Sequence, residues 1–496
     1  MLRKLRSFIF RSPGDWKYWL MMAFLCRGLL FIFQLVFLRY TTIHGFWGAS
    51  GGDTDSYLTP IEHLIQKGSY APNLRMPGYG FFYYPLILLF PKAIACNILI
   101  VFQAAMGAVS VYALALLALK TFKSSGFFYL VFFLFGLSTF SAIYDIRLQS
   151  ESLCTSFLIL SIYFYVNYLS GQTSRRNLIL SGLFMTLTVF LRPVFVLYFP
   201  AMLLMLLVVL YRSNKKLIMP GLCFLAVFIA VDGAWLVRNY GKYHRIVPLT
   251  ASLNYPNYTS SWVYATGQFV QTWGGGMCYW DPKEEIAWFG TAGKSNVSLP
   301  SDIYTSKFNK DSLEQIRKTI STLLPKTDFL KLSTDTCLEE TAALPEVVVL
   351  KRKLGIYAQS VKEEKPWLYY VKAPALFLKK MIYRDGGTGN LFQKPFTELN
   401  KKEKSIRMLY TVLYLFVMTG GLAGMFLLFR KGWSSPLIMI SAAVCLYQVV
   451  IHAIVFRSTE QRYLVPAYPF FVICSVYLLL TLYQTFFRHS RKLEIT

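Results

Sequence analysis

Charged side chains are scarce in this 496-residue sequence, since Asp, Glu, Lys and Arg together make up only 15% of it. Soluble domains carry about 25% charged residues, so the sequence lacks the polar surface that a soluble fold of this length requires. It has instead 55% hydrophobic residues, 17% aromatic residues and a mean hydropathy of +0.43. This composition predicts a polytopic membrane protein.

Acidic residues are the scarcer of the two charged types, with 25 Asp and Glu against 51 Lys and Arg and a net charge of +26. In a soluble protein, such an excess favours nucleic acid as a partner. Here the basic residues cluster at the ends of apolar runs, where membrane orientation and anionic lipid account for them. We therefore expect membrane lipid, and no nucleic acid, among the partners.

Metal-binding and redox motifs are also missing. The five His are scattered, and no CxxC or HExxH pattern occurs, so the residues predict no metal site and no cofactor; dependence on a divalent metal stays open. Most of the eight Cys lie in apolar runs and are expected to act as small hydrophobes. Cys278 and Cys337 lie in a polar segment, where they form either a disulfide or two free thiols, depending on the compartment.

The long apolar runs predict transmembrane helices, each of which needs about 20 mostly apolar residues. The first run follows a basic start without a small-residue cleavage site, so we expect an uncleaved span rather than a signal peptide. Arg192-Pro193 marks the boundary between the fifth and sixth spans, because proline ends or kinks a helix. The ten predicted spans are residues 18–40, 93–119, 126–143, 152–169, 177–191, 194–211, 217–236, 408–429, 435–455 and 464–487.

The basic residues also predict the orientation of these spans. With the N-terminus in the cytoplasm, the short inner segments hold most of the Lys and Arg near span ends, and the short outer turns hold few. This asymmetry follows the positive-inside rule and predicts that both termini lie inside. We expect a multi-pass cell (inner) membrane with the functional face toward the periplasm or exterior, or the ER membrane in a eukaryote.

The predicted spans divide the chain into a transmembrane module (1–236) with a long first outer loop (41–92), an outer domain (237–405) and C-terminal transmembrane helices (406–496). The 237–405 segment is too long for a structureless loop, and helix-like runs predict a mixed, mainly helical domain. Within it, VKAPALFLKKMIY (371–383) is expected to lie flat in the membrane interface. Asn257 and Asn296 match the glycosylation pattern. The predicted fold is all-α, with about ten transmembrane helices and amphipathic juxtamembrane helices.

Acidic residues outside the 237–405 domain and the two tails fall on one side of the predicted membrane. No cytoplasmic loop between spans holds an acid. For each acid alone, helix capping or balancing an arginine explains it as well as a place in a site does, but the set favours a shared polar site on the outer side. These acids are Asp53, Asp55, Glu62, Asp145, Glu151, Asp232 and Glu460.

The first outer loop contains the stretch GGDTDSYLTPIEHLIQKG (51–68), which predicts a short amphipathic helix that ends at Gly68. Such a helix is expected to lie along the membrane surface. Asp53 and Asp55 stand at its start. Helix capping needs one carboxylate and contributes about 1 kcal/mol, so the second carboxylate is surplus to capping. Arg75 follows in RMPGY.

Two further outer motifs combine arginine with a carboxylate. YDIRLQSESLCTSF holds Arg147 and Glu151, which either pair with each other or line a site. FRSTEQRYLVPAYP places Arg457 and Arg462 at the outer end of the last span. Arginine at this position runs against the positive-inside trend, and its bidentate guanidinium suits phosphate oxygens, so these residues predict a bound anion.

Glycosyl transfer from a polyprenyl-phosphate sugar needs a carboxylate to remove a proton, arginines to hold the phosphate and an apolar bundle for the lipid tail. The alternative is a transporter or flippase of a lipid-linked or anionic solute. Its acids and arginines are expected near mid-span in broken helices, a description that only Asp232 approaches. A scaffold in envelope assembly is a third alternative, which the outer acids and arginines disfavour.

These motifs resemble the GT-C superfamily of integral membrane glycosyltransferases, in particular the dolichyl-phosphate-mannose and aminoarabinose transferase branch, which uses polyprenyl-phosphate sugars. The outer domain between the seventh and eighth spans departs from many relatives, whose outer domain follows the last span, so the resemblance does not imply the acceptor. The similar stretches are GGDTDSY with RMPGY, RLQSESL, LRPVFVLYFP, WLVRNYGKYHRIVPLTAS and EQRYLVPAYP.

The resemblance implies transfer of a sugar, with inversion, to a hydroxyl or amine of a glycolipid, polysaccharide or protein on the periplasmic or luminal side. Asp53 matches the family's first-loop catalytic base better than Asp55, because Asp53 precedes Tyr57 by four positions. Glu151 and Arg147 are expected to shape the sugar or phosphate pocket, and Arg75, Arg192 and Arg462 are phosphate candidates. The expected substrate-binding residues are Asp55, Tyr57, Arg75, Tyr79, Arg147, Glu151, Arg192, Arg238, Gln461, Arg462 and Tyr463.

Overall fold

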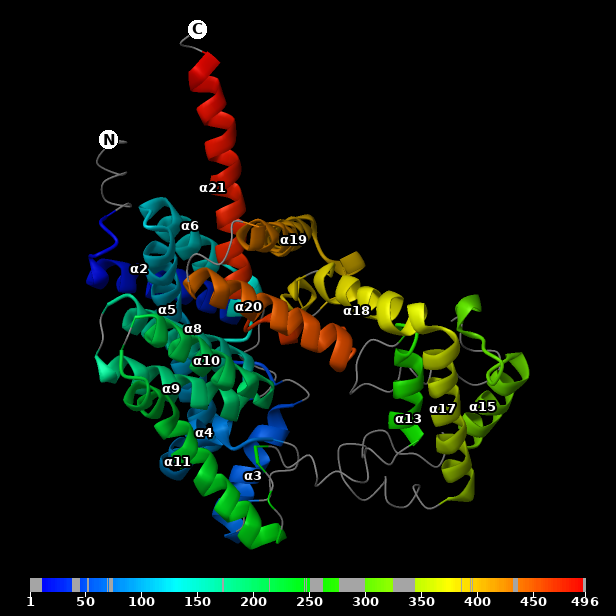
Figure 1. The fold of residues 1–496 in the computed structure, drawn as a ribbon. Helices are drawn as coiled ribbons and strands as arrows, with labels where there is room; N and C mark the ends of the chain where they lie inside the picture. Colours follow the sequence, from blue (N-terminus) through cyan, green and yellow to red (C-terminus); the bar gives the residue numbers. More distant parts are fainter. Residues whose placement is uncertain are drawn as a thin grey trace. The chain divides into compact units, whose positions relative to one another are not determined.

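The chain is an all-helical polytopic membrane protein, as its composition predicts (Figure 1). The computed structural model describes residues 11–37, 45–50, 53–68, 70, 75–171, 174–213, 215–244, 246, 248–249, 262–275, 299–323, 344–384, 386–392, 394, 396–430 and 436–493. No strand occurs in this described part. Cys278, Cys337, Asn257 and Asn296 lie outside the described residues, so their predicted roles stay predictions.

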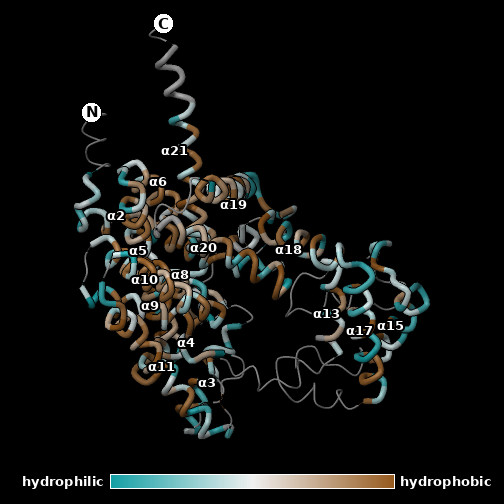
Figure 2. Tube along the Cα trace, in the orientation of Figure 1, coloured by the Kyte–Doolittle hydropathy of each residue, from teal (hydrophilic) through white to brown (hydrophobic). Residues whose placement is uncertain are grey.

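Among the described residues, seven helices are long and apolar enough to cross a membrane, and they form much of the hydrophobic part of the molecule (Figure 2). Each corresponds to one predicted span. They are α2 (Trp16–Phe37), α5 (Lys92–Phe122), α8 (Glu151–Leu169), the η2 and α10 pair (Pro193–Leu197 and Tyr198–Arg212), α11 (Ile218–Tyr243), α19 (Lys401–Arg430) and α21 (Tyr468–Leu493).

The other three predicted spans differ from single long helices. The prediction of one continuous helix over 126–143 was wrong. The helix α6 (Ser125–Gly136) ends early, and α7 (Thr139–Ala142) follows as a separate helix. The 17-residue α9 (Arg175–Leu191) ends at the predicted boundary, where Arg192 is extended and Pro193 begins η2. The third, α20 (Pro436–Val450), continues into the π-helical turn η9 (Ile451–Val455).

The segment 41–92, predicted as the first outer loop, contains two helices among its described residues. The predicted amphipathic helix is confirmed as α3 (Thr54–Lys67), which ends at Gly68 in the left-handed conformation with φ of 65°. The apolar helix α4 (Gly78–Leu89) was not predicted. It lies against α9 at Gly78, where a Cβ would be 2.4 Å from the backbone carbonyl of Phe190. Only glycine allows the two backbones to approach so closely.

A short backbone link brings the start of α3 to the start of α8. The amide of Ala49 donates to the Ile146 carbonyl at 3.0 Å, and the amide of Leu148 donates back to the Ala49 carbonyl at 3.3 Å. The Thr54 hydroxyl donates to the Leu148 carbonyl at 3.0 Å. A Cβ on Gly48 would lie 2.2 Å from the Ile146 carbonyl oxygen, so glycine is required beside this link.

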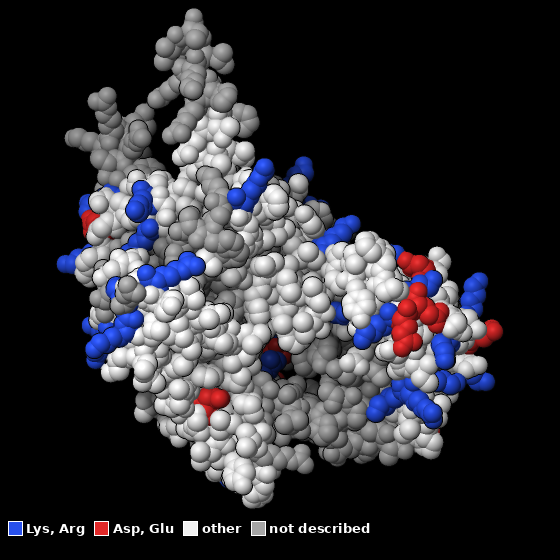
Figure 3. Space-filling model, in the orientation of Figure 1, with Lys and Arg blue, Asp and Glu red and all other residues white. Residues whose placement is uncertain are grey.

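The chain forms two compact units. Unit 1 comprises Met1–Ala251, Arg384–Leu446 and Arg462–Thr496, and unit 2 comprises Ser252–Tyr383 and Tyr447–Gln461. Unit 2 has its own apolar core, formed largely by α13 (Trp262–Gln271), α15 (Lys310–Leu323) and α17 (Pro345–Glu364). Acidic and basic side chains mix on its surface (Figure 3), as expected for a domain in water.

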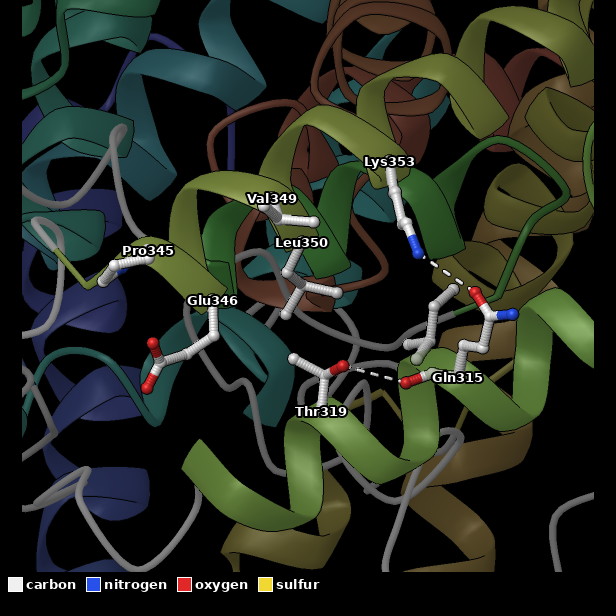
Figure 4. Close-up of a pocket in the computed structure, with 8 residues that line it drawn as sticks. Gln315, Thr319, Pro345, Glu346, Val349, Leu350 and Lys353 are labelled. Atoms are coloured by element: carbon white, nitrogen blue, oxygen red, sulfur yellow. Dashed lines mark hydrogen bonds between the residues drawn. The ribbon is translucent and has the colours of Figure 1, made fainter.

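A pocket of about 250 Å³ lies between α15 and α17 in unit 2 (Figure 4). Thr319, Val349 and Leu350 line it, and at one edge Lys353 Nζ donates to Gln315 Oε1 at 3.0 Å. None of the predicted site residues lines this pocket. The predicted chemistry therefore has to be sought in unit 1.

Candidate active site

Asp53 occupies the N-cap position of α3, but its side chain makes no cap hydrogen bond. The carboxylate instead receives two guanidinium groups. Arg75 Nη2 lies 2.6 Å from Oδ1, and Arg462 Nη1 lies 2.5 Å from Oδ2. The Asp53 side chain is 24% exposed, so water reaches it in part. Helix capping therefore does not explain this carboxylate, which is held by arginines from two distant segments.

The first turn of α3 orients Arg75. Its Nε donates to Ser56 Oγ at 3.0 Å, and that hydroxyl donates to the Asp53 carbonyl at 2.6 Å. The Arg75 guanidinium also lies 4.8 Å from the centre of the Tyr57 ring, a favourable cation–π distance. Arg75 thus contacts both Asp53 and Tyr57, two predicted residues at the start of α3.

Arg462 connects this group to a second ion pair. It lies on η10 (Gln461–Leu464), and its Nε is 4.0 Å from Glu151 Oε1. Because its Nη1 contacts Asp53, one guanidinium lies between two carboxylates. Asp53 and Glu151 stand at the starts of two different helices, α3 and α8, and the segment that carries Arg462 joins them.

Glu151 is the first residue of α8, and its side chain is only 1% exposed. Its Oε1 accepts from Arg192 Nη2 at 2.5 Å, and Arg192 Nε donates to Ser150 Oγ at 3.2 Å. The alternative that Arg147 pairs with Glu151 was wrong, because Glu151 pairs with Arg192. Its second oxygen, Oε2, is buried without a hydrogen-bond partner among the described residues, so it can accept from a ligand.

Arg147 differs from the other three arginines. No described carboxylate lies within ion-pair distance of it, and its guanidinium is 5.9 Å from the centre of the Tyr144 ring. Burial raises the pKa of Tyr144 to about 12, and the charges of Arg147, Arg192 and Arg462 act on the same hydroxyl in the opposite direction. Tyr144 therefore lies beside Arg147 and within the electrostatic reach of Arg192 and Arg462.

Aromatic and polar side chains pack against this group of arginines and carboxylates. The Tyr57 hydroxyl lies 2.9 Å from Ser150 Oγ, and its ring centre is 5.1 Å from that of Tyr79. The Tyr79 hydroxyl donates to Gln103 Oε1 at 2.8 Å, and Gln103 Nε2 donates to the Arg147 carbonyl at 2.9 Å. Tyr79 is fully buried, so it supports Tyr57 rather than lining the site surface. Tyr463 lies 5.2 Å from the Arg192 guanidinium and 5.3 Å from that of Arg462.

Positive charge exceeds negative charge in this group. Four arginines, Arg75, Arg147, Arg192 and Arg462, accompany the two carboxylates of Asp53 and Glu151. Burial alone raises the pKa of Asp53, but the attraction of Arg75 and Arg462 outweighs it and holds that pKa below its ordinary value. These contacts keep Asp53 ionised, and the group has two positive charges that no described acid balances.

Three predicted substrate-binding residues lie elsewhere. Asp55 is exposed in the first turn of α3 and has no hydrogen bond or ion pair to another described residue. Arg238, on α11, donates to the Tyr70 carbonyl and lies 5.0 Å from the Trp235 ring centre. Gln461 is buried at the first position of η10, directly before Arg462. The contacts described for these residues do not include Asp53.

Sequence reasoning missed several residues that hold the site together. Ser150 and Gln103 carry no charge, so only their place beside Glu151 or in a span could have drawn attention to them. The pair of Arg27 and Asp145 was seen only as separate residues, although Arg27 Nη1 lies 3.2 Å from Asp145 Oδ2. Asp145 Oδ1 also accepts from Ser152 at 2.6 Å. This buried pair fixes the turn that leads into Glu151.

The fold and this group of side chains define a helical membrane protein with an arginine-rich carboxylate site at the start of α3 and α8. Within the described ranges, no group of three or more His, Cys, Asp or Glu side chains is placed to hold a metal ion. The arrangement can bind an anion through arginine and accept a proton at Asp53.

Comparison with known proteins identifies no family. No family model matches the chain, and no curated protein matches it. Among solved structures, it is similar to the archaeal oligosaccharyltransferase AglB from Archaeoglobus fulgidus, determined in complex with an inhibitory peptide and a dolichol-phosphate. The identity is 12% and the TM-score 0.46, over 96% of this chain and 52% of that chain. The chain thus spans about half the length of AglB, and its function is inferred from the site itself.

Proposed function

We propose that the protein is a membrane glycosyltransferase that moves a sugar from a polyprenyl-phosphate donor to an acceptor hydroxyl or amine on the outer side of the membrane. The observation that carries this proposal is the Asp53 carboxylate held between Arg75 and Arg462, at 2.6 Å and 2.5 Å. It supports the proposal because such a transfer requires a carboxylate that can accept a proton and cationic groups that can bind phosphate, and here the two kinds of group are in contact.

In the proposed reaction, the acceptor oxygen or nitrogen attacks the anomeric carbon from the face opposite the phosphate. The bond between the anomeric carbon and the phosphate oxygen breaks, and polyprenyl phosphate leaves with the electron pair. Asp53 takes the proton that the acceptor loses. One displacement inverts the anomeric configuration, and no covalent enzyme intermediate forms.

The charge balance of the site supports a phosphodiester donor. Such a donor carries one negative charge, and the polyprenyl phosphate that leaves carries close to two, because the second pKa of a phosphate monoester is about 6. The site has two positive charges in excess, from four arginines and two carboxylates. It therefore complements the leaving group better than the intact donor, which is the condition for catalysis by electrostatic stabilisation.

Donor binding would also change the state of Asp53. Both of its oxygens contact guanidinium groups in the structure, which lower its pKa and weaken it as a base. A phosphate that binds Arg75 and Arg462 competes for these groups and frees the carboxylate for the acceptor. Glu151 Oε2, buried without a described partner, is positioned to accept from a sugar hydroxyl.

A transporter or flippase of a lipid-linked solute remains the competing function, since it would use the same arginines to bind phosphate. The two functions differ in one bond. Transport leaves the donor intact, whereas transfer releases free polyprenyl phosphate. The Asp53 position favours transfer, because moving an anion does not require a base beside the binding arginines.

The experiment uses the full chain in proteoliposomes, with synthetic polyprenyl-phosphate mannose, glucose and aminoarabinose as donors. Membranes from cells that lack the gene supply the acceptors, and released polyprenyl phosphate is measured by mass spectrometry. Asp53→Asn keeps the side-chain shape and removes the base, so release should fall by at least about 10²-fold.

Asp55→Asn is the matched control, because Asp55 lies two residues away on the same helix, is exposed and makes no described ion pair. It should retain the rate of the unchanged protein. Near-normal release by the Asp53 variant would exclude this residue as the base. Donor that crosses the bilayer without release of polyprenyl phosphate would identify a transporter.

A further inference from the structure

A row of exposed aromatic and aliphatic side chains lies on one continuous helix of unit 2. This helix includes the π-helical turn η6 (Leu368–Lys372) and α18 (Ala373–Ile382). Trp367 is 70% exposed, Tyr370 57% and Val371 42%, and Tyr383 after α18 is 56% exposed. Large apolar side chains with such exposure cost free energy in water, about 25 cal/mol per Å² of apolar surface. A row of them therefore indicates a partner.

The end of a shorter apolar helix carries a second exposed apolar group. The apolar helix Met439–Val455 belongs to unit 2 from Tyr447 onward, and its last turn is η9. At its end Ile454 is 51% exposed, Val455 62% and Phe456 44%. The next residue, Arg457, is buried.

The two groups belong to one packed structure within unit 2. Ala373 and Phe377 of α18 form an apolar cluster with Ala453 of η9. Arg457 Nη2 donates to the Tyr369 carbonyl at 2.9 Å, and its guanidinium lies 3.8 Å from the Tyr369 ring centre. The exposed residues on either side of these contacts are thus held in fixed positions. We call Trp367, Tyr370, Val371, Ile454, Val455 and Phe456 the aromatic face.

We propose that the aromatic face lies in the headgroup boundary of the membrane and binds lipid, so that unit 2 rests on the bilayer. Trp and Tyr are the residues that concentrate at this depth, because their rings are apolar and their N–H or O–H groups are polar. Lys379, exposed on the same helix, suits the phosphate of a lipid headgroup. This lipid contact is independent of the proposed transferase activity.

Lipid fits the face better than a soluble protein partner, because the face continues from a helix that is itself apolar enough for the membrane. Ile454 and Val455 close that helix, and its Ala453 packs against Ala373 and Phe377 of α18, so one apolar contact links the two exposed groups. The sequence predicted interfacial contact only for 371–383. The structure extends the face back to Trp367 and adds the end of η9.

The test introduces the photo-crosslinking residue p-benzoylphenylalanine at single positions of the full chain, reconstituted in vesicles of equal parts neutral and anionic phospholipid. It replaces Trp367 or Val371 in the aromatic face. Val349, 54% exposed on α17 in the same unit, is the matched control, and Met21, 59% exposed on the membrane helix α2, is the positive control. After irradiation, mass spectrometry counts the phospholipid adducts.

We expect the yield of phospholipid adducts at positions 367 and 371 to be about tenfold higher than at 349 and close to that at 21. Side chains at the boundary between headgroups and acyl chains would give such yields. All four positions are exposed, so the substitution leaves the buried core unchanged, and elution as a single species verifies folding. Yields at 367 and 371 no higher than at 349 would overturn the proposal. Crosslinks to a second copy of the chain in place of lipid would overturn it as well.

Discussion

Arg462→Gln provides a sharp test of the electrostatics, because this arginine lies between Asp53 and Glu151. Two opposing effects follow from its loss. Asp53 loses one of the three arginine attractions that lower its pKa, so it becomes a stronger base. The leaving phosphate loses one of the charges that stabilise it. The rate depends on which effect is larger.

The magnitudes favour a large loss of rate. Two unit charges about 4 Å apart attract each other by about 1 kcal/mol in water and about 4 kcal/mol near a protein surface. Arg462 is 18% exposed, which places a phosphate contact between these limits and predicts a decrease of roughly 10- to 10³-fold. An increase of one unit in the pKa of the base raises the rate only about threefold, since only part of the gain in basicity is expressed in the rate.

The pH–rate profile distinguishes this explanation from simple unfolding. In the proposed reaction, Asp53 acts as a base only when ionised, so the rate should fall as pH falls through its pKa. Because Arg462 lowers that pKa, its removal moves the acid limb of the profile to higher pH. Release of polyprenyl phosphate is measured across pH in the unchanged protein, Arg462→Gln and the charge-retaining Arg462→Lys. A normal rate, or an acid limb at lower pH, would refute the reasoning.

Three other predictions concern the site and its supports. Arg192→Gln removes the closer of the two guanidinium groups beside Glu151, a side chain of 1% exposure, and leaves only Arg462 at 4.0 Å, so the melting temperature in detergent should fall by the equivalent of up to about 3–5 kcal/mol. Adding Glu151→Gln should recover part of the loss, and strictly additive losses would argue against the pair. Gly182→Ala should also lower the melting temperature, because its Cβ would lie 2.1 Å from a backbone carbonyl of α11. Gly233→Ala, with nothing within 4 Å, should leave it unchanged or raised by about 0.5–1 kcal/mol in equivalent stability. Tyr57→Phe removes one hydrogen bond and keeps the ring, so kcat should fall by no more than about tenfold; a larger fall would give the hydroxyl a direct catalytic role.

Sequence patterns predicted the helices that carry the site better than they predicted helix ends. The helix after Asp53 was predicted because its apolar residues recur at helical spacing and Gly68 can adopt a left-handed conformation. α4 was missed because its residues are apolar all round, so no periodicity separated it from the following span. The break after α6 was missed because apolar residues continue across it.

The partners of the charged residues illustrate what sequence cannot reach. Arg147 and Glu151 are neighbours in sequence, yet Glu151 pairs with Arg192, 41 positions away. Arg462 reaches Asp53 across 409 positions. Charge type and side of the membrane made each of these residues a candidate, but no local pattern specifies which carboxylate meets which guanidinium.

The sequence by itself determined that this protein is helical, lies in a membrane and places an acid at the start of an amphipathic helix, because hydropathy and helical periodicity are properties of local segments. Only the tertiary structure decided that Asp53 meets Arg75 and Arg462 rather than capping its helix. It also left Arg147 without a described carboxylate partner. Pairing of charges depends on which helix ends the packing brings within a few ångströms of each other, and that packing is a property of the whole chain.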